Sequence, residues 1–189
     1  LARVREVFDD EAVGAIFVVM PLESGKSVLL FLPAAQQLLG HPVQVLSGEE
    51  EVVLTYLGVA DGATADGDPA RTLVLGIGGG STQLALGSGR RVQKVASLGL
   101  GTSRLALTFF GGGRIDAVSF AAAIASTRAK LGDEAPAFGP GRRDRAYGAS
   151  GTIHTLARLL VDNDLAGPVT RGRLETLAAR ALAQGGGGA

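Results

Sequence analysis

The sequence predicts an α/β protein in which two kinds of strand connectivity follow one another. A strand, a helix and a strand come first, in the order typical of a parallel βαβ unit. Three short strands joined by glycine-rich turns follow, as in an antiparallel meander. The polar segment DGATADGDPA at 61–70 separates the two patterns. We therefore expect part of one domain over 1–60 and a second domain over 61–189.

A further helix precedes the strand, helix and strand of the first pattern. The expected elements are a helix, a strand, a second helix and a second strand, at 2–12, 15–20, 31–40 and 43–46. The next helix begins after Ser47, because Ser47-Gly48-Glu49-Glu50 has the spacing of a capping box. Ser47 and Glu50 thereby receive structural roles.

The second pattern contains the meander and most of the helices. Its expected strands lie at 72–77, 82–87 and 91–98, with a weak strand at 145–150 and a loop before it. Its expected helices lie near 102–110, 116–131, 152–160 and 172–184. The order βββαβα is that of the ribonuclease-H-like half found in actin-type phosphotransferases and phosphohydrolases. The fold class expected is therefore one nearly complete domain of this type plus part of a preceding one.

The composition excludes several classes of function. The 189 residues include 18 basic and 18 acidic side chains, which speaks against a nucleic-acid partner bound through a basic surface. Apolar stretches are too short to span a membrane. Cysteine is absent, so no thiolate nucleophile is available and a cytoplasmic location fits. The chain begins at Leu1 without a methionine, as expected of a fragment.

The first candidate site is the glycine turn VLGIGGGSTQLALG at 74–87. Gly78, Gly79 and Gly80 can adopt dihedrals closed to other residues, so their amides can form an anion nest. Ser81 and Thr82 add hydroxyl donors. The structural alternative is a glycine-rich hairpin that binds no ligand.

Two further segments offer candidate residues. The capping box leaves Glu51 without a structural role, and a carboxylate near a phosphate site can act as a general base. The segment GASGTIHTLARLL supplies a second turn, at the start of a helix whose amides attract anions. The alternative for this turn is plain helix capping by Ser150 or Thr152. His154 is expected on the helix surface, since only His41 could join it in a metal site.

Three segments in this order resemble the exopolyphosphatase and guanosine pentaphosphate phosphohydrolase family, Ppx/GppA. They are SGEEEVVLTYLGVA (47–60), GIGGGSTQLALG (76–87) and YGASGTIHTLARL (147–159). SLGLGTSRL (97–105) is similar to the family segment that follows the third strand, and the resemblance covers about 34–184.

This resemblance implies two ribonuclease-H-like domains of the actin, sugar kinase and heat-shock ATPase superfamily, with a cleft between them. It implies Mg²⁺-dependent hydrolysis of terminal phosphoanhydrides in polyphosphate or guanosine pentaphosphate (pppGpp), and a homodimer is an assembly to test for. Glu51 takes the place of the catalytic glutamate. The phosphate-binding positions implied are Gly78, Gly79, Gly80, Ser81, Thr82, Gly148, Ser150, Gly151 and Thr152.

The sequence also departs from the family pattern at two positions of the glycine turn. The family turn has the form Asp-x-Gly-Gly-Gly-Ser-Thr-Glu, whereas this chain has Gly76 and Gln83 at the two acidic places. No metal-ligating residue is therefore assigned. The alternative function is a non-catalytic phosphate-binding relative, or an inactive fragment, of the same fold. A kinase or chaperone-type ATPase would also need an adenosine pocket, for which no segment is found.

Overall fold

The computed structural model describes residues 16–18, 37, 40, 43–63, 69–113 and 115–185. The chain divides into two compact units, Leu1–Glu51 and Val52–Ala189, and each is described by itself. The helix expected at 2–12, nearly all of the one expected at 31–40, and the last four residues lie outside the described residues. The domain boundary expected after residue 60 stays a prediction.

The first unit contains the predicted parallel strand pair. Strand β1 (Ile16–Val18) pairs with β2 (Val43–Val45), and Ile16 lies opposite Val43. Helix α3 (Gly48–Ala63) begins directly after Ser47, as the capping box predicted. It continues through Asp61 to Ala63, so the polar break begins later than expected. In the last turn of the helix, Asp61 forms an ion pair with Arg90.

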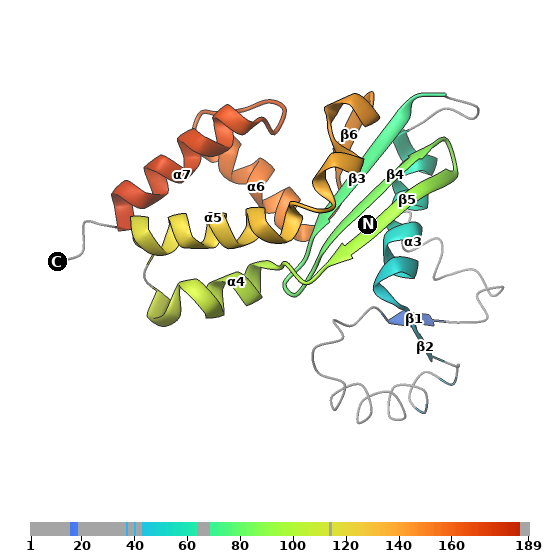
Figure 1. Ribbon diagram of the computed structural model, residues 1–189, viewed down its shortest axis with the longest axis horizontal. Helices are drawn as coiled ribbons and strands as arrows, with labels where there is room; N and C mark the ends of the chain where they lie inside the picture. The colour runs from blue at the N-terminus through green and yellow to red at the C-terminus, as the bar shows by residue number, and fades with distance from the viewer. Residues whose placement is uncertain are drawn as a thin grey trace. The chain divides into compact units, whose positions relative to one another are not determined.

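The second unit is built on a four-stranded sheet with the strand order β5-β4-β3-β6 (Figure 1). Strands β3 (Arg71–Ile77), β4 (Thr82–Ser88) and β5 (Arg91–Leu98) form the antiparallel meander predicted from their short turns. Strand β6 (Arg145–Gly148) pairs with β3 in parallel. The predicted meander and weak fourth strand are therefore confirmed.

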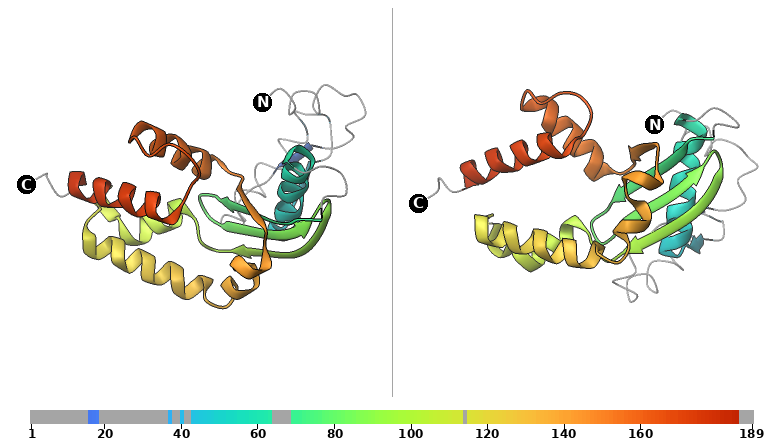
Figure 2. Two further views of the ribbon diagram at one scale, coloured as in Figure 1. Left: turned by 90° about the horizontal axis from the view of Figure 1, so that it is seen from above. Right: turned by 45° about the horizontal axis from the view of Figure 1, so that its top comes forward.

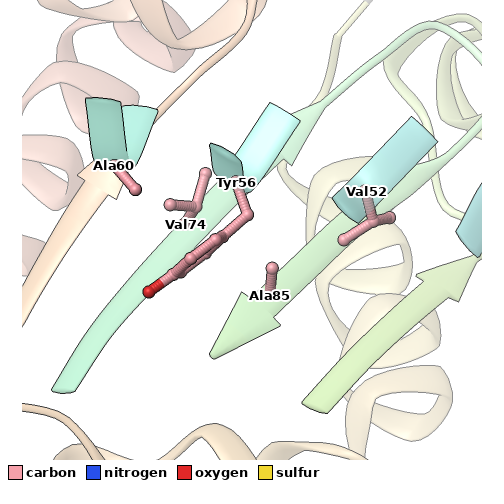
Figure 3. Close-up of a cluster of buried hydrophobic side chains, with 5 residues drawn as sticks. All are labelled: Val52, Tyr56, Ala60, Val74 and Ala85. Carbon is pink, nitrogen blue, oxygen red and sulfur yellow. The ribbon is translucent and has the colours of Figure 1, made fainter. Parts of the chain in front are cut away.

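One face of this sheet packs against α3 (Figure 3). Tyr56 is fully buried there with Val52, Ala60, Val74 and Ala85. Its ring covers Gly87, where an added Cβ would lie 2.6 Å from the Tyr56 hydroxyl oxygen. That hydroxyl donates to the carbonyl of Gly89 at 3.0 Å, and burial raises the pKa of Tyr56.

The opposite face of the sheet is covered by the segment before β6. Phe138 packs there among four buried residues: Leu73, Leu84, Leu86 and Ala96. The segment expected to be a plain loop forms two short 3₁₀ helices, η3 (Ala135–Phe138) and η4 (Pro140–Arg142), each with a proline in its first two positions. Lys94 lies over the Phe138 ring at 5.5 Å and pairs with Glu134 at 3.4 Å, which fixes η3 to β5.

The remaining helices of the second unit extend beyond the end of the sheet at which the β3–β4 turn lies (Figures 1 and 2). They are α4 (Thr102–Phe109), α5 (Ala117–Leu131), α6 (Gly151–Asp162) and α7 (Arg171–Gly185), with the 3₁₀ turn η2 (Gly111–Gly113) after α4. α4 contacts α5, and α6 contacts α7. In the described part of the chain, no helix has the length and apolar character needed to cross a membrane.

Candidate functional site

The glycine turn connects β3 to β4, where the sequence predicted it. β3 ends at Ile77 and β4 begins at Thr82. The turn is closed by a hydrogen bond of 2.8 Å from the Gly78 amide to the Ser81 carbonyl. The prediction that Gly78–Ser81 forms the first turn of the meander is confirmed.

The carbonyls of this turn hold the start of α4. The Thr102 amide donates to the Gly78 carbonyl at 2.9 Å, and the amides of Ser103 and Arg104 donate to the Gly79 carbonyl at 2.9 and 3.2 Å. A helix leaves its first amides without partners inside the helix, so the turn satisfies three of them. The sequence prediction missed this role, although the glycine at 101, directly before α4, is a signal for it.

The amides of the turn are used differently from its carbonyls. Within the described residues, the amides of Gly79, Gly80 and Ser81 have no hydrogen-bond acceptor. The Thr82 hydroxyl donates to the Leu100 carbonyl at 2.7 Å. The proton of the Thr82 hydroxyl is thus used within the fold, and the backbone amides and the Ser81 hydroxyl are the donors of the turn that remain for a ligand.

The second turn follows β6 and is fixed directly to β3. Gly148 lies opposite Leu75, and the Ala149 amide donates to the Leu75 carbonyl at 2.8 Å. Ser150 caps α6, and its Oγ accepts from the Ile153 amide at 3.3 Å and from the Ile77 amide at 3.2 Å. The parallel β3–β6 pairing therefore brings the two turns of the sequence to one edge of the sheet.

The two bonds to Ser150 constrain its hydroxyl proton. A serine hydroxyl has one proton and two lone pairs. Both lone pairs of Ser150 face backbone amides, so the hydroxyl can only donate to a third partner. Structural capping and ligand binding are thus compatible at this residue, although the sequence presented them as alternatives.

The remaining residues of the second turn surround the start of α6. Gly148 is required there, because an added Cβ would lie 2.3 Å from Ile153 Cγ2. Gly151 and Thr152 occupy the first turn of the helix, where backbone amides favour an anion. His154 is exposed on the helix, as expected.

Gly76 and Gln83 lie directly opposite each other on β3 and β4. An added Cβ at Gly76 would be 3.1 Å from Gln83 Oε1 and 3.1 Å from the Ala149 carbonyl oxygen. Mg²⁺ is usually held through one or two carboxylates, and this pair provides none. In the parts of the chain that the structure describes, no three His, Asp or Glu side chains are grouped closely enough to hold a metal ion. The residues present do not fit the Mg²⁺ site that the family resemblance implies.

The predicted capping box is confirmed in the first unit. The Ser47 amide donates to Glu50 Oε2 at 2.7 Å, and the Glu50 amide donates to Ser47 Oγ at 3.2 Å. The hydrogen bond from the Ser47 amide to the carboxylate, followed by that from the Ser47 side chain, lowers the pKa of Glu50. Glu51 is half-buried in the same helix turn, and its amide donates to the Ser47 carbonyl at 3.0 Å. Its place relative to the glycine turn stays a prediction, because the two belong to different units.

The arrangement in the second unit suits an anion rather than a cation. The two turns lie side by side and present backbone amides and a hydroxyl donor, and α6 adds the positive end of its dipole. Such a site can hold a phosphoryl group and offset charge that develops on it.

Comparisons with known proteins identify relatives over most of the chain. The model of the Ppx/GppA phosphatase family matches residues 28–185. A guanosine-5'-triphosphate,3'-diphosphate pyrophosphatase of Vibrio vulnificus is 34% identical over 161 residues, covering 85% of this chain and 32% of that protein. The protein of the same name in Vibrio parahaemolyticus is 32% identical over 161 residues, again covering 85% of this chain and 32% of that protein. The chain thus spans about a third of the length of these curated relatives.

Solved structures agree with these sequence relatives. The PPX-GPPA enzyme of Aquifex aeolicus is 27% identical, with a TM-score of 0.66 over 90% of this chain and 53% of that one. An exopolyphosphatase of Cytophaga hutchinsonii has a TM-score of 0.73 at 19% identity, covering 96% of this chain and 61% of that one. The likeness confirms the predicted α/β fold of the actin, sugar kinase and heat-shock ATPase type.

Proposed function

Because this chain belongs to the Ppx/GppA phosphatase family, we propose that it forms part of a phosphohydrolase that releases the terminal phosphate of pppGpp. The observation that supports this most strongly is the hydrogen bond from the Ile77 amide to Ser150 Oγ. It joins two segments 73 residues apart, and each segment ends in a turn suited to phosphate.

The choice of pppGpp over polyphosphate follows the curated relatives. Those at 34% and 32% identity are named for guanosine-5'-triphosphate,3'-diphosphate. The proteins named for exopolyphosphatase activity are 19% and 23% identical and support only the fold. Polyphosphate is therefore the second substrate to test. A cytoplasmic location and a homodimer also belong to this proposal and rest on the sequence alone.

In the proposed reaction, the amides of Gly79, Gly80 and Ser81 bind the terminal phosphoryl group together with the Ser150 hydroxyl and the start of α6. Gly78, Thr82 and Gly148 shape the two turns. Glu51 takes the proton of the attacking water as general base. Its neighbour Glu50 belongs to the capping box with Ser47, and the family resemblance assigns the role of base to Glu51.

Phosphate release from pppGpp and from polyphosphate tests this proposal on the purified chain. We expect release from pppGpp above the uncatalysed rate, with smaller release from polyphosphate. Binding is measured in parallel by calorimetry with inorganic phosphate. Phosphate binding without release would support the non-catalytic alternative, and the absence of both would refute the proposed function.

A further inference from the structure

We propose that the phosphate site of this chain binds its anion without a divalent cation, and that Gln83 determines this property. The inference rests on the proposed function and deepens it. It concerns only the second unit, which contains both turns.

The first support is the packing of Gln83 over Gly76. The two residues are cross-strand partners, and the Gln83 carboxamide lies 3.1 Å from the place where a Cβ at residue 76 would be. The Ala149 carbonyl lies equally close on the other side, and the Ala149 amide is fixed to Leu75. The space that a side chain at 76 would need is therefore filled by neutral groups.

The second support is electrostatic. A carboxylate beside bound phosphate repels it unless a cation lies between the two charges. A carboxamide carries no charge, and its amino group can donate to a phosphate oxygen. Gln83 therefore permits phosphate to bind without an accompanying divalent cation, whereas a glutamate at this position would require a cation for the same ligand.

The third support is the charge of the segments that form the site. From Pro69 to Ile115 the sequence contains six Lys or Arg residues and no Asp or Glu. From Arg145 to Val161 it again contains no Asp or Glu. Three of the six, Arg71, Arg90 and Lys94, are paired with Asp144, Asp61 and Glu134 outside these ranges. What the two segments contribute is therefore the lack of any carboxylate of their own that could bind a divalent cation.

Amide NMR of the ¹⁵N-labelled chain tests the inference with inorganic phosphate as the probe. We expect phosphate to shift the amide signals of Gly79, Gly80, Ser81 and Gly151, with Kd values in EDTA and in excess MgCl₂ that agree within about twofold. MnCl₂ should cause no selective broadening of the same signals. Phosphate binding that requires Mg²⁺, or selective Mn²⁺ broadening at the turn, would overturn the inference.

The variant Gln83→Glu is used in the second part of the experiment. It should weaken phosphate binding in EDTA by about tenfold, equivalent to about 1.4 kcal/mol. MgCl₂ should recover part of the loss. Gln93→Glu is the matched control. Gln93 is exposed near the start of β5, away from the glycine turn, and the substitution makes the same chemical change. Equal phosphate binding by both variants in EDTA would contradict a role for Gln83.

The two proposals fail in different ways. If phosphate shifts none of the turn amides under either condition, the proposed function fails and this inference fails with it. If phosphate binds only with Mg²⁺, the proposed function stands and this inference alone is wrong. The Mn²⁺ measurement uses the unmodified chain, so it decides the matter even if Gln83→Glu does not fold.

Discussion

The glycines around the two turns have different neighbours, and these neighbours decide which positions tolerate a side chain. At Gly101, an added Cβ would be 2.1 Å from the Gly79 carbonyl oxygen. That oxygen accepts the amides of Ser103 and Arg104, so it cannot move without releasing the start of α4. At Gly99, two residues earlier, the nearest atoms are 3.9 Å away and belong to the Arg104 side chain.

We therefore predict that Gly101→Ala lowers the free energy of unfolding by about 2 to 3 kcal/mol, as overpacking against a fixed backbone does. Gly99→Ala should lie within about 0.5 kcal/mol of the unmodified chain. Urea unfolding of both variants measures the difference, provided that the slope with denaturant is unchanged. Equal urea midpoints for the two variants would contradict the close contact between the Gly79 carbonyl and Gly101.

For individual residues, the sequence predicted hydrogen bonds within one segment better than those between segments far apart in the chain. The Ser47–Glu50 capping box follows from a spacing of three residues, and its two hydrogen bonds are both present. The engagement of the Thr82 hydroxyl by Leu100 and of Ser150 Oγ by Ile77 depends on segments that only the fold brings together. No pattern within one segment contains that information.

Among the elements, β3 and the chain entering β6 are joined by an exposed ion pair. Arg71 Nη2 lies 2.7 Å from Asp144 Oδ1, and the Arg71 amide donates to Asp144 Oδ2 at 2.8 Å. In return, the Asp144 amide donates to the Arg71 carbonyl at 2.8 Å. The hydrogen bonds from the Arg71 side chain, followed by that from its amide, lower the pKa of Asp144 from 3.8 to about 2.

This lowered pKa predicts a specific dependence of stability on pH. Because the pKa of Asp144 is lower in the folded state, the pair stabilises fully above about 3.8 and loses its contribution as pH falls to about 2. The urea midpoint of the unmodified chain should exceed that of Asp144→Asn at neutral pH, and the two should converge across this window. High salt should reduce the gap, since both side chains are nearly half exposed.

Arg71→Gln is the matched variant for this measurement. It keeps Asp144 but removes the guanidinium, so the pKa of Asp144 should rise toward its ordinary value. An NMR titration of the Asp144 carboxyl carbon follows the change directly. An unchanged titration in Arg71→Gln would remove Arg71 as the cause.

The order and pairing of the elements could largely be predicted from the sequence. Apolar runs of strand length and short glycine turns were sufficient for the meander, which has the predicted antiparallel pairing. The end of α3 was placed too early, because Asp61 and Gly62 favour a break locally whereas the helix continues to Ala63. The 3₁₀ turns at η3 and η4 were missed although Pro136 and Pro140 are local signals for them, whereas the packing of Phe138 against the sheet depends on segments that only the fold brings together.

For the whole molecule, the proposed chemistry divides between the two units. The anion-binding turns belong to Val52–Ala189, whereas the proposed base, Glu51, is the last residue of Leu1–Glu51. Binding and turnover should therefore respond to different substitutions. A residue that only accepts the proton of water contributes to the chemical step and little to the affinity for phosphate.

We predict that Glu51→Gln reduces the rate of phosphate release from pppGpp by about 10²–10⁴-fold, the usual contribution of a general base. The Kd for inorganic phosphate should change by less than about threefold, because the turn amides and Ser150 are untouched. Glu49→Gln is the control: Glu49 is exposed in the same first turn of α3, and its substitution should leave turnover unchanged. Unfolding midpoints of both variants should match the unmodified protein, which separates a catalytic loss from a folding defect. If Glu51→Gln retains full turnover, the base lies elsewhere. If Glu49→Gln loses as much turnover as Glu51→Gln, the acidic helix turn acts through its charge and not through one carboxylate.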